Sequence, residues 1–276
     1  MLRSVLLYME EAKRAAPVIQ LAVSLARETE ARVRGMTLVD TRALDEALDS
    51  ESAMYVSMAH THTAVSEHTH SGARAELSRA CLHASLNFDV RGFCGNPLEI
   101  LPTEARFHDL VVASAEIFER QFPATLYSTL SPDDISELVK RGVQPLMLLP
   151  SSVTEIRRVL LIYDGSEAAG RAIRSYFNLG VLRGADHRLL SFGRKESEAK
   201  ASLSEMADYC LSHCRSLETG YAVGRPSRRL AAYAAKWQPD LVVLGIERKR
   251  GLVTRLMGRA TIDLLKTLNC GMLVQA

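Results

Sequence analysis

A possible anion-binding surface is formed by two segments that each follow a short apolar run. The run 159–163 is followed by Asp164 and Gly165, and the run 241–244 is followed by Gly245. Both runs have the length and composition of buried parallel strands. In an open α/β sheet, backbone amides hold phosphate where such strands end and helices begin. The pattern therefore predicts a nucleotide pocket that uses both segments.

The residues after Gly245 add candidates for phosphate recognition. Arg248 and Arg259 carry positive charge, and Gly258 permits close backbone approach. The same residue types also have simpler explanations. Loops commonly contain glycines, and runs of basic residues are commonly solvated surface. Asp164 fits a turn before a helix cap. Both interpretations stay open. The candidate nucleotide contacts are Asp164, Gly165, Gly245, Arg248, Gly258 and Arg259.

Composition narrows the class of protein. The 276 residues are 47% hydrophobic and 24% charged, and 34 basic against 32 acidic residues leave a net charge of only +2. No global field attracts nucleic acid or an anionic membrane, and no apolar run has the length of a signal sequence or a membrane span. Five cysteines without a CxxC pair are atypical of a secreted disulfide framework. We therefore expect a cytoplasmic protein.

The chain repeats four landmarks in the same order, which indicates two similar units. Each landmark is an apolar strand or a helix start, and the matched pairs are 4–8 with 159–163, 95–98 with 224–227, 109–113 with 240–244, and 145–149 with 271–275. The predicted domains are 1–152 and 153–276. Continuous apolar strands alternating with helices favour two tandem doubly wound α/β domains, each with a five-stranded parallel sheet.

Two clusters could bind a transition metal, although simpler interpretations compete. A histidine-rich insertion is predicted at 45–72, and its two His-x-His pairs are either chelators or part of a mobile polar segment. Cys210, His213 and Cys214 would share one face of a presumed helix, where they are either soft ligands or small buried side chains. We assign no metal site to either cluster.

These landmarks resemble the universal stress protein family, and specifically its tandem members with two such domains on one chain. The family loop reads Gly, two residues, Gly, nine residues, Gly, then Ser or Thr. Gly245 and Gly258 match the first and last glycines, whereas Arg248 and Arg259 replace the second glycine and the hydroxyl residue. The resemblance implies that Asp164 faces the nucleoside of ATP or another adenine nucleotide. The two arginines would either block the pocket or hold phosphate through side chains.

The first half departs further from this pattern. Its first strand ends in Met9, Glu10 and Glu11 in place of the aspartate motif, and the segment 114–120 after its fourth strand contains no glycine. We expect this half to bind no nucleotide in the family manner.

The resemblance implies a tandem stress-response protein that works by binding an unidentified protein partner, with nucleotide in the second half as a control. One alternative is a scaffold without nucleotide, and another is a slow nucleotide hydrolase; sequence signals for catalysis are poor. The last strands of the two halves, 146–149 and 271–274, are apolar edges that we expect to pair within the chain. A homodimer is a further option.

Overall fold

The computed structural model describes residues 1–9, 12–42, 45, 57, 70–115, 132–142, 144–193, 196–223, 226–246 and 270–276. The elements of the first half are β1 (Ser4–Met9), α1 (Ala12–Arg27), β2 (Arg32–Asp40), β3 (Phe88–Gly95), α4 (Pro97–Ala105), β4 (Leu110–Ser114), α5 (Pro132–Arg141) and β5 (Leu146–Leu149). Those of the second half are β6 (Arg158–Tyr163), α6 (Glu167–Leu179), β7 (Asp186–Gly193), α7 (Glu196–Leu211), β8 (Leu217–Val223), α8 (Pro226–Trp237), β9 (Leu241–Gly245) and β10 (Gly271–Gln275). Residues 70–83 are also helical.

The described strands form one ten-stranded sheet in the order β3-β2-β1-β4-β5-β10-β9-β6-β7-β8. Within each half the strands are parallel, and the second half repeats the order of the first in reverse along the sheet. The predicted α/β fold with two doubly wound units is confirmed. Within the described residues, no helix is both long and apolar enough to span a bilayer.

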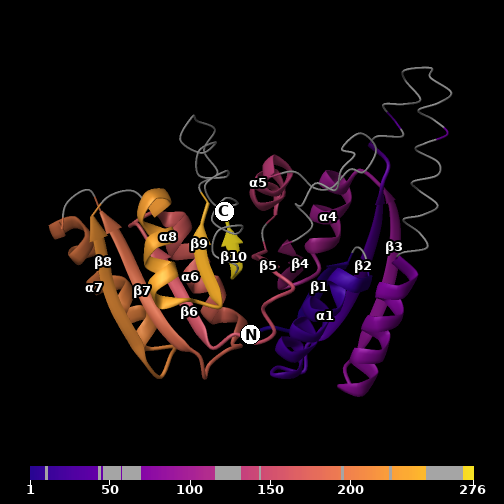
Figure 1. Cartoon of the computed structure of the whole chain (residues 1–276), viewed down its shortest axis with the longest axis horizontal. Coiled ribbons are helices and arrows are strands. Elements are labelled where there is room, and N and C mark those ends of the chain that lie inside the picture. The colour runs from indigo at the N-terminus through magenta and orange to yellow at the C-terminus, as the bar shows by residue number, and fades with distance from the viewer. Residues whose placement is uncertain are drawn as a thin grey trace.

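The two halves join through their last strands. Strands β5 and β10 pair antiparallel, with Leu148 opposite Met272 and Met147 opposite Leu273. Of the strand pairs in the described part of the chain, this one alone is antiparallel. Figure 1 shows β5 and β10 between the halves, with both ends of the chain near the junction. The two apolar edges therefore cover each other, as expected from the sequence.

Both faces of the sheet carry cores that continue across the junction. Met147 and Leu273 belong to the core beneath α1 and α6, whereas Leu148 and Met272 belong to the core beneath α4, α5 and α8. All four side chains are at most 2% exposed. Because successive strand residues point to opposite faces, each residue of the junction serves one of the two cores. The halves therefore share their hydrophobic cores as well as their sheet.

An aspartate holds the first strand of each half at the same place. The Asp109 carboxylate accepts hydrogen bonds from the backbone N–H groups of Arg3 and Ser4, at 2.7 and 3.0 Å. Asp240 accepts from the N–H groups of Arg157 and Arg158, at 2.9 and 2.8 Å. The repeated aspartate before the apolar runs 110–113 and 241–244 thus ties the start of β4 to β1, and the start of β9 to β6.

Helix starts follow the sequence landmarks. Helices α4 and α8 begin at Pro97 and Pro226, whose missing N–H costs nothing at that position. Most of the predicted insertion 45–72 lies outside the described residues. At its end, residues 70–72 belong to the helix that continues to residue 83, and His70 is buried. The end of that segment is therefore part of the fold.

Candidate functional site

The order of the strands in the second half places a candidate ligand crevice beside β6. The chain leaves β6 through α6 toward β7 on one side, whereas β9 flanks β6 on the other. In open α/β sheets, ligands bind at the carboxyl ends of the strands where the order reverses in this way. Asp164 follows β6 directly, and Gly245 is the last residue of β9. Two residues chosen from the sequence therefore lie at this point.

Asp164 closes the turn between β6 and α6. Its Oδ1 accepts a hydrogen bond from the Ser166 N–H at 3.0 Å, and Gly165 has a φ of 79°, which favours glycine. Ser166 is the N-cap of α6, where its Oγ accepts from the Ala169 N–H at 3.1 Å. The Asp164 side chain remains exposed. Its turn function is established by these contacts, and its carboxylate stands beside a helix N-terminus.

Gly245 is required by packing. A Cβ at this position would lie 2.2 Å from the Ala168 carbonyl carbon and 2.3 Å from the Ala169 nitrogen. The end of β9 therefore lies against the backbone of the first turn of α6, an approach that no side chain permits. This contact explains the glycine without a phosphate, and it also fixes the two walls of the crevice. Arg248, Gly258 and Arg259 lie outside the described residues.

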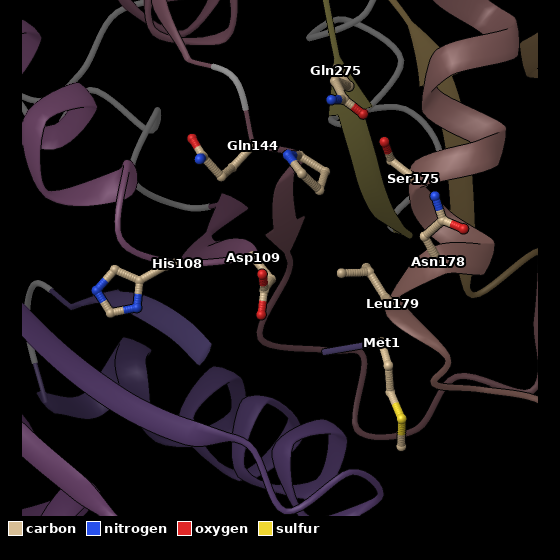
Figure 2. Close-up of a pocket in the computed structure, with 9 residues that line it drawn as sticks. Met1, His108, Asp109, Gln144, Ser175, Asn178, Leu179 and Gln275 are labelled. Atoms are coloured by element: carbon tan, nitrogen blue, oxygen red, sulfur yellow. The ribbon is translucent and has the colours of Figure 1, made fainter. Parts of the chain in front are cut away.

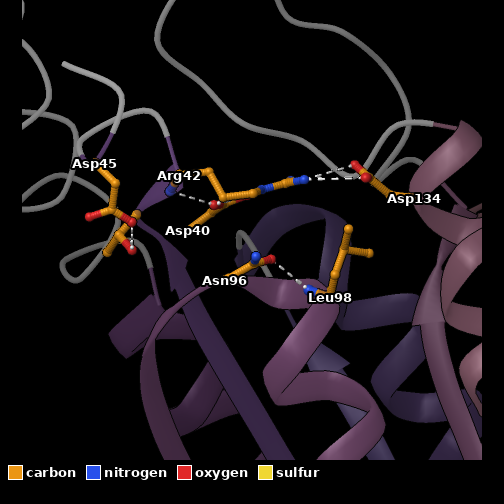
Figure 3. Close-up of polar contacts among 7 residues, drawn as sticks. Asp40, Arg42, Asp45, Asn96, Leu98 and Asp134 are labelled. Atoms are coloured by element: carbon orange, nitrogen blue, oxygen red, sulfur yellow. Dashed lines mark hydrogen bonds and ion pairs between the residues drawn. The ribbon is translucent and has the colours of Figure 1, made fainter. Parts of the chain in front are cut away.

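In the first half, an ion-pair bridge occupies the carboxyl edge of the sheet. Arg42 Nη2 lies 2.7 Å from an oxygen of Asp40, the last residue of β2, and Arg42 Nη1 lies 3.2 Å from an oxygen of Asp134 in the first turn of α5. Figure 3 shows the guanidinium extended between the two carboxylates. The Asp40 hydrogen bond raises the pKa of Arg42. Two carboxylates balance this cation, so the bridge presents no net positive charge to a phosphate.

Sequence reasoning did not find this bridge. Arg42 and Asp134 are 92 positions apart, and each residue alone reads as ordinary surface charge. Asp134 lies in the first turn of α5, which begins at Pro132.

The prediction that Cys210, His213 and Cys214 share a helix face was wrong, because α7 ends at Leu211. The His213 ring instead stacks on Phe177, with centroids 5.4 Å apart. Burial raises the pKa of the Cys210 thiol to about 12, and the Cys214 thiol donates to the Cys210 carbonyl oxygen. Within the described residues, no three His, Cys, Asp or Glu side chains gather in a way that could hold a metal.

A pocket of about 240 Å³ lies at the junction of the halves. Its lining residues come from both halves and are Met1, His108, Asp109, Gln144, Pro145, Ser175, Asn178, Leu179 and Gln275. Figure 2 shows Asp109 and Gln144 on one side of the pocket and Ser175, Asn178 and Leu179 of α6 on the other, with the Gln144 amide pointing away from α6. Only Asp109, Pro145 and Gln275 of this lining belong to segments that repeat in the sequence, and no motif marks the other residues. The strand pairing of β5 with β10 brings them together.

His108 makes stability depend on pH. Burial, followed by the charge of Arg34, lowers the pKa of His108 to about 4, and its Nδ1 lies 2.7 Å from Ser4 Oγ. The folded protein keeps this ring neutral, whereas the unfolded chain protonates it below a pH of about 6.5. We expect its contribution to be full above that pH and to fall by about 2 kcal/mol between pH 6.5 and pH 4. Urea unfolding across this range should show a smaller loss in His108→Gln than in the wild type.

The second half, which contains the candidate crevice, has a counterpart among known protein families. Residues 155–275 match the model of the Universal stress protein family. The second half is therefore similar to the universal stress protein family. The matched segment includes the turn at Asp164, the glycine at Gly245 and the paired strand β10.

Solved structures extend the likeness to the whole chain. A universal stress protein from Archaeoglobus fulgidus DSM 4304 is 12% identical with a TM-score of 0.72, over 99% of this chain and 95% of that one. A putative universal stress protein from Pseudomonas aeruginosa UCBPP-PA14 is 15% identical with a TM-score of 0.66, over 99% and 93%. At these identities the likeness concerns the fold. The tandem arrangement of this chain therefore has the fold of solved structures of similar length.

Proposed function

We propose that the second half binds one molecule of ATP or another adenine nucleotide in the crevice between β6 and β9. The observation that supports this most is the position of Asp164 and Gly245, at the reversal of strand order in a universal stress protein domain. The carboxylate of Asp164 would accept from nucleoside hydroxyls. Gly165, Arg248, Gly258 and Arg259 would complete the site as the sequence suggests.

We propose that the first half does not bind nucleotide, so that each chain has one nucleotide site. The bridge of Arg42 with Asp40 and Asp134 supports this, because a phosphate would have to displace a carboxylate from the guanidinium. The chemistry at the same edge thus differs between the halves, although their strand order is the same.

We propose that the protein acts by binding a protein partner, with nucleotide altering the junction through α6. The helix begins at the crevice with Ser166 and ends against the first half, where the Leu2 N–H donates to the Leu179 carbonyl at 2.7 Å. The Leu182 N–H, in the turn that follows α6, donates to the Glu28 carboxylate of the first half at 2.9 Å. A ligand that moves the first turn of α6 would therefore act on the contacts between the halves.

The proposed setting is a stress response in the cytoplasm. All five cysteines are free, which supports a reducing compartment. A homodimer is proposed only as an additional assembly, because β5 and β10 already pair within the chain.

Mass spectrometry of the supernatant from heat-denatured purified protein, together with calorimetric titration of ATP, tests the proposed function. We expect adenine nucleotide in the supernatant or one binding event per chain. A blank supernatant with no heat on titration would support the scaffold alternative. Release of inorganic phosphate above the buffer rate would support the slow hydrolase.

Asp164→Ala should weaken ATP binding about fivefold, since one net hydrogen bond to the nucleoside is lost. Asp208→Ala is the matched control, because Asp208 is an exposed aspartate on α7 of the same half. Asp164→Asn keeps an oxygen for the Ser166 N–H and separates the turn from the ligand contact. Equal affinity in Asp164→Ala and Asp208→Ala would contradict the assigned contact. Two equivalent sites would contradict the inactive first half.

A further inference from the structure

The pocket at the junction differs in position from the proposed nucleotide crevice. Asp109 and Pro145 stand at the amino ends of β4 and β5, whereas the crevice lies at the carboxyl ends of β6 and β9. The second wall of the junction pocket is the end of α6, with Ser175, Asn178 and Leu179. A molecule bound here would touch both halves at once (Figure 2).

Hydrogen-bonding groups around the pocket remain available. Within the described part of the chain, the side chains of Gln144, Ser175 and Asn178 form no hydrogen bond, and none is buried. Both backbone donors to Asp109 bind its Oδ2, which leaves Oδ1 without a donor among the described residues. The amides and the hydroxyl can each donate and accept, whereas the carboxylate only accepts. The pocket wall therefore offers both hydrogen-bond donors and hydrogen-bond acceptors to a ligand.

The lining carries no net charge. Its charged groups are the Asp109 carboxylate and the N-terminal ammonium of Met1, and no lysine or arginine side chain belongs to it. His108 is neutral at pH 7, with its ring pointing away from α6 in Figure 2. A ligand with a net charge of either sign would therefore meet a group of its own sign in the lining. The apolar part of the lining comes from Leu179, Pro145 and Met1.

We propose that this pocket binds a small neutral polyhydroxylated molecule of about monosaccharide size. Hydroxyl groups donate to Asp109 Oδ1 and exchange hydrogen bonds with Ser175 and Asn178, while a C–H face packs on Leu179. The volume of about 240 Å³ is below that of pockets for drug-sized ligands, which fits a ligand of this size. The inference is independent of nucleotide binding in the second half.

Titration of the full chain, followed by amide resonances in nuclear magnetic resonance spectra, tests the pocket. The probes are glucose and myo-inositol as neutral polyols, glucose 6-phosphate as an anion, and 1,4-diaminobutane as a cation. We expect a neutral polyol to shift resonances around Gln144 and Asn178 with a Kd on the order of 1–10 mM. Tighter binding of the phosphate or the diamine would overturn the ligand class. No shift with any probe would overturn the site.

Asn178→Ala should weaken polyol binding about fivefold, because one amide contact is lost. Asn87→Ala is the control, since Asn87 is an exposed asparagine just before the outer strand β3. Both variants should melt like the wild type, because Asn178 is exposed and its amide bonds to no described residue. Equal affinity in Asn178→Ala and Asn87→Ala would overturn the assignment of the pocket. Weaker polyol binding in Asn178→Ala but not in Asn87→Ala, with ATP binding unchanged in both, would support the assignment.

Discussion

Gly245→Ala should lower the free energy of unfolding by about 3 kcal/mol, near the upper end of overpacking costs. The added methyl would meet the backbone of Ala168 and Ala169 at 2.2–2.4 Å, where no flexible side chain can move away. Relief requires that α6 shift from the end of β9, which also opens the candidate crevice. Urea unfolding followed by circular dichroism measures the loss of stability.

Two other glycines of the same half serve as controls. At Gly170, inside α6, a Cβ would make only ordinary contacts with Met206 and Tyr163, at 3.7 and 3.9 Å. Gly170→Ala should therefore stabilise the protein by about 0.5–1 kcal/mol, because alanine is the better helix former. At Gly184 a Cβ would meet nothing within 4 Å. If Gly245→Ala were as stable as Gly184→Ala, the close approach of β9 to α6 would be contradicted.

Asp240→Ala should cost about 2–3 kcal/mol, because it removes the acceptor of two backbone N–H groups at the start of β6. Asp109→Ala should cost a similar amount at the start of β1. We expect each variant to unfold in one transition, detected equally by fluorescence and by circular dichroism, because sheet and cores continue across the junction.

The double variant Asp109→Ala/Asp240→Ala tests further whether the two halves unfold together. The two carboxylates share no partner, so their effects should add within about 0.5 kcal/mol. Two separated transitions, with only one moved by each substitution, would show that the halves unfold independently. Asp186→Ala provides an exposed aspartate control at the start of β7.

The sequence predicted the alternation of strands and helices well, because buried parallel strands such as 241–244 are continuous apolar runs. It also predicted the cap at Ser166 and the helix starts at Pro97 and Pro226, since these depend on neighbouring residues alone. The end of α7 was missed because Cys210, His213 and Cys214 carry no strong stop signal.

Contacts between distant segments were harder to foresee. Gly245 looked like a phosphate-loop glycine, and only the course of α6 shows that backbone packing requires it. The bridge from Arg42 to Asp134 and the pocket between Gln144 and Asn178 depend on where the chain returns in space. Spacing along the sequence contains no measure of such distances.

The antiparallel pairing of β5 with β10 also affects how the molecule behaves on dilution. An interface between separate subunits dissociates as concentration falls, whereas these strands belong to one polypeptide and meet at a fixed, high effective concentration. The halves cannot exchange with those of another molecule without separating β5 from β10 and opening the shared cores. Every copy therefore contains one half of each kind, and changes in expression level alter the number of molecules while their composition stays constant.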